Sequence, residues 1–245
     1  GIKVSIKELL SLTFGISIFF LLVNIFINID ILLLSGMGTS KELIGYYKAA
    51  TSLGIALYFI LASIIQVVYP VFSKLYVEKK NIELRKLINT ITVTFFIIAS
   101  FAFVFLYNFS EILITIFLGS KYIYATDILP YYAFSIGLLS VVILLGNMMI
   151  AFQKNKSFLF LLFCSVIAYG LLVLFLYQFI GLLSPPIALS VVSLVSIIGL
   201  FIMINSNKDN LIDFKKTFIM ILSIFSLMIL SIFIFTASGS VHFFT

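Results

Sequence analysis

The sequence predicts an all-α protein built as a polytopic bundle of transmembrane helices. Hydrophobic residues make up 63% of its 245 residues, its mean hydropathy is +1.29, and only 10% of its residues are charged. Soluble domains average about 45–50% apolar and about 25% charged residues, so a water-soluble fold of this length could not bury so much apolar surface. The apolar residues also form continuous runs of about 20 residues, the length at which an α-helix crosses a bilayer.

By this length criterion the chain contains seven candidate membrane spans. Their continuous apolar character excludes a strand barrel, whose spans alternate in hydropathy and are about ten residues long. A helix satisfies its own backbone hydrogen bonds in lipid, so each span is expected to be helical. The predicted spans are Leu9–Leu34, Ile44–Phe72, Leu87–Tyr107, Ile128–Phe152, Phe158–Leu183, Ile187–Ile204 and Phe218–Phe235.

The lysines and arginines alternate between the two sides of these spans. All of the 15 basic residues except Lys41, Lys48 and Lys121 fall before the first span or in the loops after the second, fourth and sixth. Such an excess marks the cytoplasmic side, so we expect a multi-pass protein of the cell membrane whose N-terminus lies in the cytoplasm. The largest cluster follows the second span and is expected to fix the topology and to contact anionic lipid of the inner leaflet. It consists of Lys74, Lys79, Lys80, Arg85 and Lys86.

The connections between spans carry their own signals. The second span is expected to stop or kink at Pro70, because proline interrupts a helix. The basic segment that follows is predicted to be either a short amphipathic helix on the inner leaflet or a solvated connector. After the third span, Ile112–Leu118 is apolar but too short to cross, and it predicts an interfacial helix that ends at Gly119. Pro130 fits the first turn of the fourth span.

The first span contains three polar residues, Asn24, Asn28 and Asp30. A carboxylate within a span costs a few kcal/mol on insertion scales, which makes Asp30 a candidate functional residue. In the predicted hairpin, Asp30 and Lys48 are equally far along the chain from Thr39 and would lie at similar depth. They could form an ion pair, or the Lys48 side chain could instead extend to the outer interface.

Asn147, near the inner end of the fourth span, is a further polar residue in an apolar run. It is either a hydrogen-bonding contact between helices or part of a substrate cavity. The sixth span has small residues at three-residue steps, namely Ser190, Ser193, Ser196 and Gly199, which predict close helix packing.

Several function classes lack their motifs. Cys164 and His242 are the only cysteine and histidine in the sequence, too few for a disulfide framework or a metal cluster. The sequence contains no GxxxxGK[ST], HExxH or GxSxG motif. We therefore expect no enzyme activity, no metal and no cofactor. The net charge of +6 does not indicate nucleic-acid binding, because the basic residues occupy short loops between spans.

Five short segments, in this order and spacing, resemble the polysaccharide flippase family, the Wzx-type branch of the multidrug/oligosaccharidyl-lipid/polysaccharide exporters. The first joins Phe14-Gly15 to a later Asp-Ile-Leu-Leu beginning at Asp30. The others are IGYYKAA from Ile44, YPVFSKL from Tyr69, IFLGSKY from Ile116 and AFQKNK from Ala151, the last with Gln153 where the family usually has glycine.

The resemblance implies a transporter with two lobes of similar topology and a substrate cavity between them. Residues 1–204 would form the second, six-span lobe, and 205–245 a cytoplasmic linker with an additional span. The N-terminal lobe would be absent from this sequence and would be its partner, together with membrane lipids. The implied activity moves a lipid-linked oligosaccharide or polysaccharide precursor across the cell membrane by alternating access. Candidate cavity residues are Asn24, Asn28, Asp30, Lys48 and Asn147.

Two other interpretations remain open at this stage. One is a cation-coupled drug exporter of the same superfamily, with Asp30 as an ion or proton site. The other is a non-transport membrane subunit of polysaccharide assembly.

Overall fold

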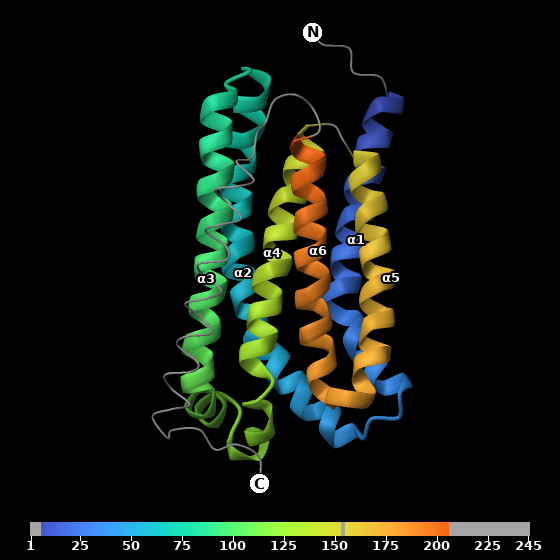
Figure 1. Cartoon of the computed structure of the whole chain (residues 1–245), viewed down its shortest axis with the longest axis vertical. Coiled ribbons are helices and arrows are strands. Elements are labelled where there is room, and N and C mark those ends of the chain that lie inside the picture. The colour runs from blue at the N-terminus through green and yellow to red at the C-terminus, as the bar shows by residue number, and fades with distance from the viewer. Residues whose placement is uncertain (1–5, 153–154, 206–245) are drawn as a thin grey trace.

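The computed structural model describes residues 6–152 and 155–205 of the chain. In these ranges it contains long antiparallel α-helices and two short 3-10 helices, with no strand (Figure 1). The elements are α1 (Ile6–Gly36), α2 (Lys41–Val77), α3 (Asn81–Phe117), η1 (Ser120–Ala125), α4 (Leu129–Ala151), α5 (Asn155–Ile180), η2 (Gly181–Leu183) and α6 (Ser184–Asn205).

These helices are long and apolar enough to cross a membrane. The described residues contain five such runs, of which the last, Ser157–Asn205, takes in α5, η2 and α6 together. The predicted all-α membrane bundle is thus confirmed. The seventh predicted span, Phe218–Phe235, lies outside the described residues.

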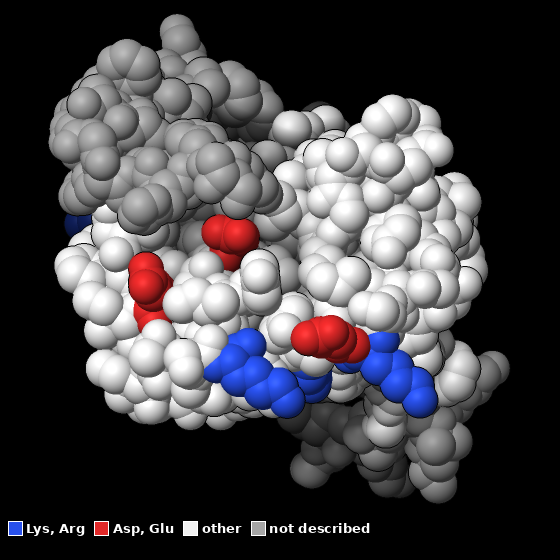
Figure 2. Space-filling view, turned by 90° about the horizontal axis from the view of Figure 1, so that it is seen from below, with Lys and Arg blue, Asp and Glu red and all other residues white. Residues whose placement is uncertain are grey.

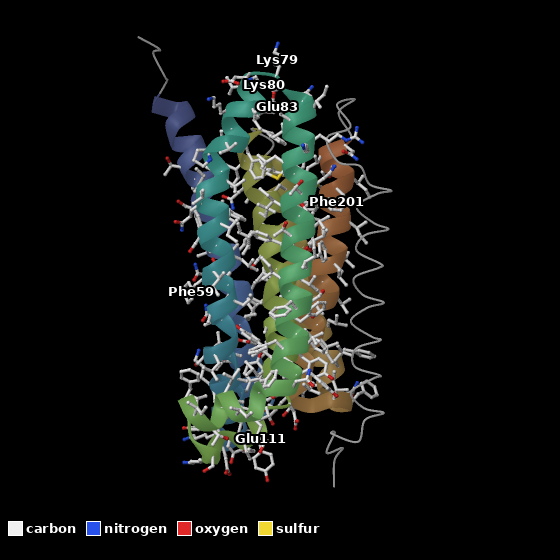
Figure 3. All side chains as sticks on the ribbon, turned by 90° about the vertical axis from the view of Figure 1, so that its left-hand side faces the viewer. Phe59, Lys79, Lys80, Glu83, Glu111 and Phe201 are labelled. Carbon is white, nitrogen blue, oxygen red and sulfur yellow. The ribbon has the colours of Figure 1, made fainter. Side chains whose placement is uncertain are left out.

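Helix α4 is the centre of the bundle. It packs against α2, α3 and α6, and 94% of its most apolar 18-residue stretch is buried, against 17% for α2. Helix α5 packs on α6 and α1 packs on α5, which places α1 at the edge opposite α3 (Figure 1). The partly exposed helices direct large apolar side chains outward; Phe59 on α2, for example, is 60% exposed (Figure 3).

Small residues allow the central helices to approach closely. A Cβ atom at Gly54 on α2 would lie 2.6 Å from Cδ1 of Tyr132 on α4. On α6, Ser196 is buried and its hydroxyl lies 2.8 Å from that of Ser165 on α5. The small-residue stripe of the sixth span therefore packs against a neighbouring helix, as the sequence predicts.

Helix α2 does not end at Pro70. It continues to Val77, and α3 begins at Asn81, so the prediction that the span stops here is wrong. A membrane helix tolerates proline where neighbouring groups satisfy the freed backbone. The separate amphipathic helix is also absent, because its basic residues lie on the ends of α2 and α3 and in the short turn between them.

Helix α3 likewise runs further than predicted. The apolar segment from Ile112 is its last part and not an independent interfacial helix, since α3 is continuous to Phe117. Gly119 adopts φ 92°, a conformation that favours glycine, and it ends the helix where predicted. The turn η1 follows and leads into α4, whose first turn contains Pro130.

The two ends of the bundle differ in charge. We call the end with the α2–α3 turn the basic end, and the opposite one the η1 end; Lys79 and Lys80 lie at the first and Glu111 at the second (Figure 3). Seen from the η1 end, acidic and basic side chains lie side by side (Figure 2). At the basic end, Glu78 forms an ion pair with Lys80 at 2.9 Å, which lowers the pKa of the Glu78 carboxyl and raises that of the Lys80 ammonium.

Candidate functional site

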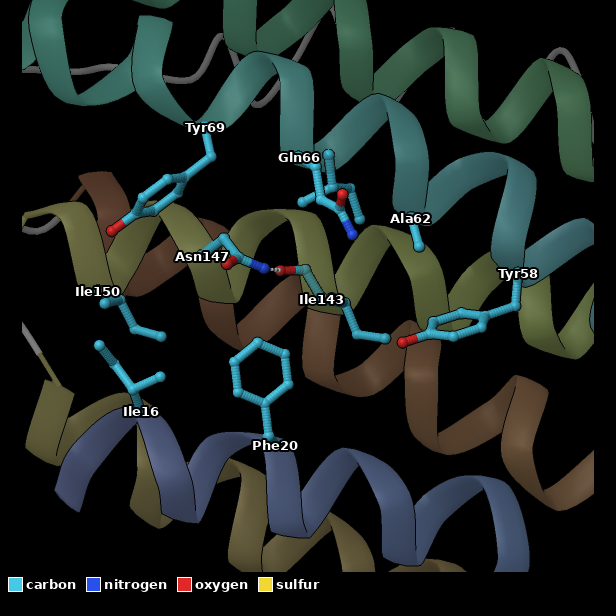
Figure 4. A pocket seen from close by; sticks show the side chains of 10 residues that line it. Ile16, Phe20, Tyr58, Ala62, Gln66, Tyr69, Ile143, Asn147 and Ile150 are labelled. Carbon is cyan, nitrogen blue, oxygen red and sulfur yellow. Dashed lines mark hydrogen bonds between the residues drawn. The ribbon is translucent and has the colours of Figure 1, made fainter. Parts of the chain in front are cut away.

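A pocket opens between α1, α2 and α4 in the half of the bundle nearer the basic end. Its volume is about 330 Å³ (Figure 4). Helix α1 forms one wall, α2 faces it, and α4 closes the back. The lining residues are Ile16, Phe20, Tyr58, Ala62, Ile65, Gln66, Tyr69, Ile143, Asn147 and Ile150.

Helical periodicity explains why these residues share one cavity. On α2, Tyr58, Ala62, Gln66 and Tyr69 follow one another at steps of four, four and three residues, which places them on one face. The residues from α1 and α4 repeat at the same spacings. The face of α2 that meets α1 and α4 here is therefore amphipathic, with two tyrosines and a glutamine among apolar neighbours.

The polar side chains of the pocket are uncharged, and several of their hydrogen-bond donors and acceptors have no partner among the described residues. The Asn147 amide donates one hydrogen bond to the backbone oxygen of Ile143, at 2.8 Å, which leaves its carbonyl oxygen and its second N–H (Figure 4). The Gln66 amide and the Tyr58 and Tyr69 hydroxyls form no hydrogen bond within the described part of the chain. These four side chains can accept and donate hydrogen bonds to a ligand.

The proline in α2 removes one backbone donor beside the pocket. Pro70 has no N–H, and in an α-helix that group would donate to the carbonyl oxygen four residues earlier. That oxygen belongs to Gln66, which lines the pocket. The Gln66 carbonyl oxygen therefore lacks the N–H donor that it would have in an uninterrupted helix.

A second polar cluster lies near the η1 end, and its side chains are buried. Asp30 on α1 is 2% exposed and accepts hydrogen bonds from the Tyr47 hydroxyl on α2, at 2.6 Å, and from the backbone N–H of Ile31, at 2.8 Å. Tyr132 on α4 is also buried, and its ring lies edge-on to that of Tyr47, with the ring centroids 6.4 Å apart. The cluster thus joins α1 to α2 by a hydrogen bond and packs α4 against them.

The structure separates the candidate residues that the sequence suggested. Asp30 has Tyr47 as its partner, and no ion pair within 4 Å joins it to Lys48, which is exposed. Asn24 and Asn28 are exposed, and each donates to the backbone carbonyl four residues earlier, at 3.0 and 2.9 Å. Of the five candidates, Asn147 alone lines the pocket.

Sequence reasoning missed Tyr58, Gln66 and Tyr69 as a group. Their spacing on one helix face was available in the sequence as a signal. It did not stand out because tyrosines in a membrane span are commonly assigned to its interfaces. Among the described residues, moreover, no three histidine, cysteine, aspartate or glutamate side chains come together to hold a metal ion.

Comparison with known proteins adds the family. Residues 2–127 match the model of a family described as polysaccharide biosynthesis protein. The chain belongs to this family. No curated protein and no solved structure gives a significant match. The matched region includes α1 and α2, which form two of the three walls of the pocket. The family match and the membrane-length helices together make this a membrane protein of polysaccharide biosynthesis.

Proposed function

We propose that this protein translocates a lipid-linked oligosaccharide or polysaccharide precursor across the cell membrane by alternating access, as a transporter without enzyme activity. The observation that supports this most directly is the pocket between α1 and α2. It combines apolar walls with uncommitted neutral polar groups inside a membrane protein of a polysaccharide biosynthesis family.

Such a precursor makes two opposite demands on its carrier. The glycan needs hydrogen-bonding groups away from lipid, and the polyprenyl chain needs an apolar path that remains open to the bilayer. The pocket supplies the first through Gln66 and Asn147. The outward faces of its walls supply the second, since Leu21 on α1 and Val67 on α2, neither of which lines the pocket, are 60% and 74% exposed.

The basic end faces the cytoplasm in this proposal, and its lysines and arginines contact anionic lipid there. The charge asymmetry supports this orientation through the positive-inside rule. In a Cys164→Ser background, a thiol reagent that does not cross membranes should label Lys121→Cys in intact cells and Lys79→Cys only after permeabilisation. The reverse pattern would refute the orientation.

Residues 1–204 act in this proposal as one lobe of a two-lobed transporter, and 205–245 supply a linker and a further span. The pocket is then part of the cavity between the lobes. In this proposal the pocket belongs to a state that substrate reaches from the basic end, and the hydrogen bond between Tyr47 and Asp30 holds α2 to α1 near the η1 end. Alternating access requires that this asymmetry reverse during transport.

A substitution that fills the pocket provides the test. In cells that depend on the full-length protein, Ala62→Leu should cause lipid-linked glycan to accumulate on the inner leaflet, because Ala62 lines the pocket. Ala56→Leu on the same helix is the matched control, since Ala56 is exposed and lies outside the pocket. Normal outward delivery in the Ala62→Leu cells at wild-type protein levels would overturn the proposal.

A further inference from the structure

We propose that the pocket between α1, α2 and α4 binds an uncharged sugar residue of the glycan, and that the phosphates of the lipid carrier stay at the basic end. This inference rests on the proposed function and specifies which part of the precursor the pocket recognises. It distinguishes the pocket from the two other parts of the same molecule, the anionic phosphate linkage and the hydrocarbon chain.

The pocket contains no charged side chain, and this argues against the phosphates. None of its ten lining residues is lysine, arginine, aspartate, glutamate or histidine. A phosphate anion moved out of water into such a site would be desolvated without a countercharge, which is strongly unfavourable. Lys74 is the first cation beyond the pocket on α2, five residues after Tyr69 and therefore about 7.5 Å further along the helix axis.

The uncommitted polar groups argue against the hydrocarbon chain. A polyprenyl segment in the pocket would cover the Gln66 and Asn147 amides and the Tyr58 hydroxyl while offering them no hydrogen bond. Covering polar groups without compensation weakens binding. Sugar hydroxyls both donate and accept, so they can satisfy the amides and the phenols.

The apolar part of the lining fits a sugar equally well. A pyranose ring has an apolar C–H face, which packs on the face of an aromatic ring. Phe20 lies on α1, across the pocket from Tyr58, Gln66 and Tyr69 on α2 (Figure 4). The Phe20 ring supplies aromatic surface on one side of the pocket, and the amides of Gln66 and Asn147 lie on the other.

This arrangement orients the whole precursor. The sugar enters the pocket, the phosphates remain near Lys74, and the prenyl chain leaves sideways into the bilayer. Two places on α2 then recognise different parts of the precursor: Gln66 in the pocket contacts the sugar, and Lys74 lies near the phosphates. Each can be substituted separately.

The chain has no tryptophan, so a single introduced tryptophan reports on its own surroundings. Phe20→Trp places the reporter in the pocket, and Phe59→Trp places it on the outward face of α2 as the control (Figure 3). The full chain is reconstituted in lipid nanodiscs and titrated with polyprenyl diphosphate-linked N-acetylglucosamine or with the same polyprenyl diphosphate without sugar. We expect the sugar-bearing lipid alone to change the emission of Phe20→Trp, and neither lipid to change that of Phe59→Trp.

Two variants separate the two recognition sites. Gln66→Leu should weaken binding of the sugar-bearing lipid by about 3- to 10-fold, the loss expected for one neutral hydrogen bond, and leave the sugar-free lipid unaffected. Ser63→Ala is its control, because Ser63 is exposed on α2 and its hydroxyl donates to its own helix. Lys74→Gln should weaken binding of both lipids by the same factor.

The inference is overturned if the sugar-free lipid changes the Phe20→Trp emission as much as the sugar-bearing one, or if the sugar-bearing lipid leaves it unchanged. It is also overturned if Gln66→Leu weakens both lipids equally. These results are separable from the transport assay. Sugar-dependent binding in a protein that fails to deliver glycan outward would refute the proposed function and leave the sugar site intact.

Discussion

The same three helices, α1, α2 and α4, behave differently at their two ends. Near the η1 end they close on Asp30, Tyr47 and Tyr132, all of which are buried. Toward the basic end they line a pocket in which the Gln66 amide and the Tyr58 and Tyr69 hydroxyls form no hydrogen bond within the described part of the chain. The short turn between α1 and α2 is itself held, since the Thr39 hydroxyl lies 2.6 Å from that of Tyr177 on α5.

The difference shows how one hairpin can be both anchored and open. Hydrogen bonds and close packing hold α1 to α2 near their turn, where the polar groups satisfy one another. Further along the hairpin, the Gln66 amide in the pocket forms no hydrogen bond within the described residues. Under the proposed function, a transporter that binds substrate from one side of a membrane while excluding it from the other requires this division.

The largest stability effect is expected from breaking the closed end. Tyr47→Phe removes the hydroxyl that donates to Asp30, and a buried polar group left without its partner costs about 1–3 kcal/mol in the free energy of unfolding. A double-mutant cycle with Asp30→Asn, measured by denaturant unfolding in detergent, should show coupling between the two sites. Gln66→Leu at the open end loses no internal hydrogen bond and should stay within about 0.5 kcal/mol of the wild type. Additive effects at Asp30 and Tyr47 would show that their contact does not stabilise the closed end.

A smaller effect is expected from separating α2 and α4 by one methyl group. Gly54→Ala places a Cβ against the buried ring of Tyr132, and overpacking of about 1–3 kcal/mol outweighs a gain in helix propensity of about 1 kcal/mol. Gly45→Ala, on the same helix with nothing within 4 Å, should stabilise by up to about 1 kcal/mol. The two midpoints of thermal unfolding should therefore move in opposite directions, and shifts of the same sign would contradict the close packing.

The smallest effect concerns the pH dependence of the basic end. The ion pair with Lys80 lowers the pKa of Glu78, so its stabilisation is present above the ordinary glutamate pKa, about 4.3, and is lost as pH falls through the lowered value. The same pair raises the pKa of Lys80, so stabilisation is present below the ordinary lysine pKa, about 10.4, and is lost as pH rises through the raised value. Glu78→Gln should lower the unfolding temperature slightly between these limits and leave it unchanged at either extreme. Because both groups are exposed, added salt should diminish the difference; a difference that persists in acid would point to another cause.

The sequence alone determined the class of the protein and most of its helices. A chain with 63% hydrophobic residues arranged in runs of about 20 has few alternatives to a membrane helix bundle, because lipid leaves the backbone no other way to satisfy its hydrogen bonds. The ordered motifs from Phe14 to Lys156 likewise indicated the polysaccharide family to which the chain belongs. These features depend on composition and local spacing, which are read directly from the residues.

Only the tertiary structure decided which polar residues meet. The sequence left open whether Asp30 pairs with Lys48 or Lys48 extends to the outer interface. In the structure it is the adjacent Tyr47 that faces α1 and donates to Asp30, because neighbouring residues on a helix point in different directions. Pro70 was expected to stop or kink the span, but α2 continues through it to Val77, and Pro70 lacks the N–H that would donate to the Gln66 carbonyl. The pocket itself lies between α1, α2 and α4, and the relative placement of these helices depends on how α4 packs between its neighbours. Helix rotation and separation are set by contacts distant in sequence, so no local pattern could fix them.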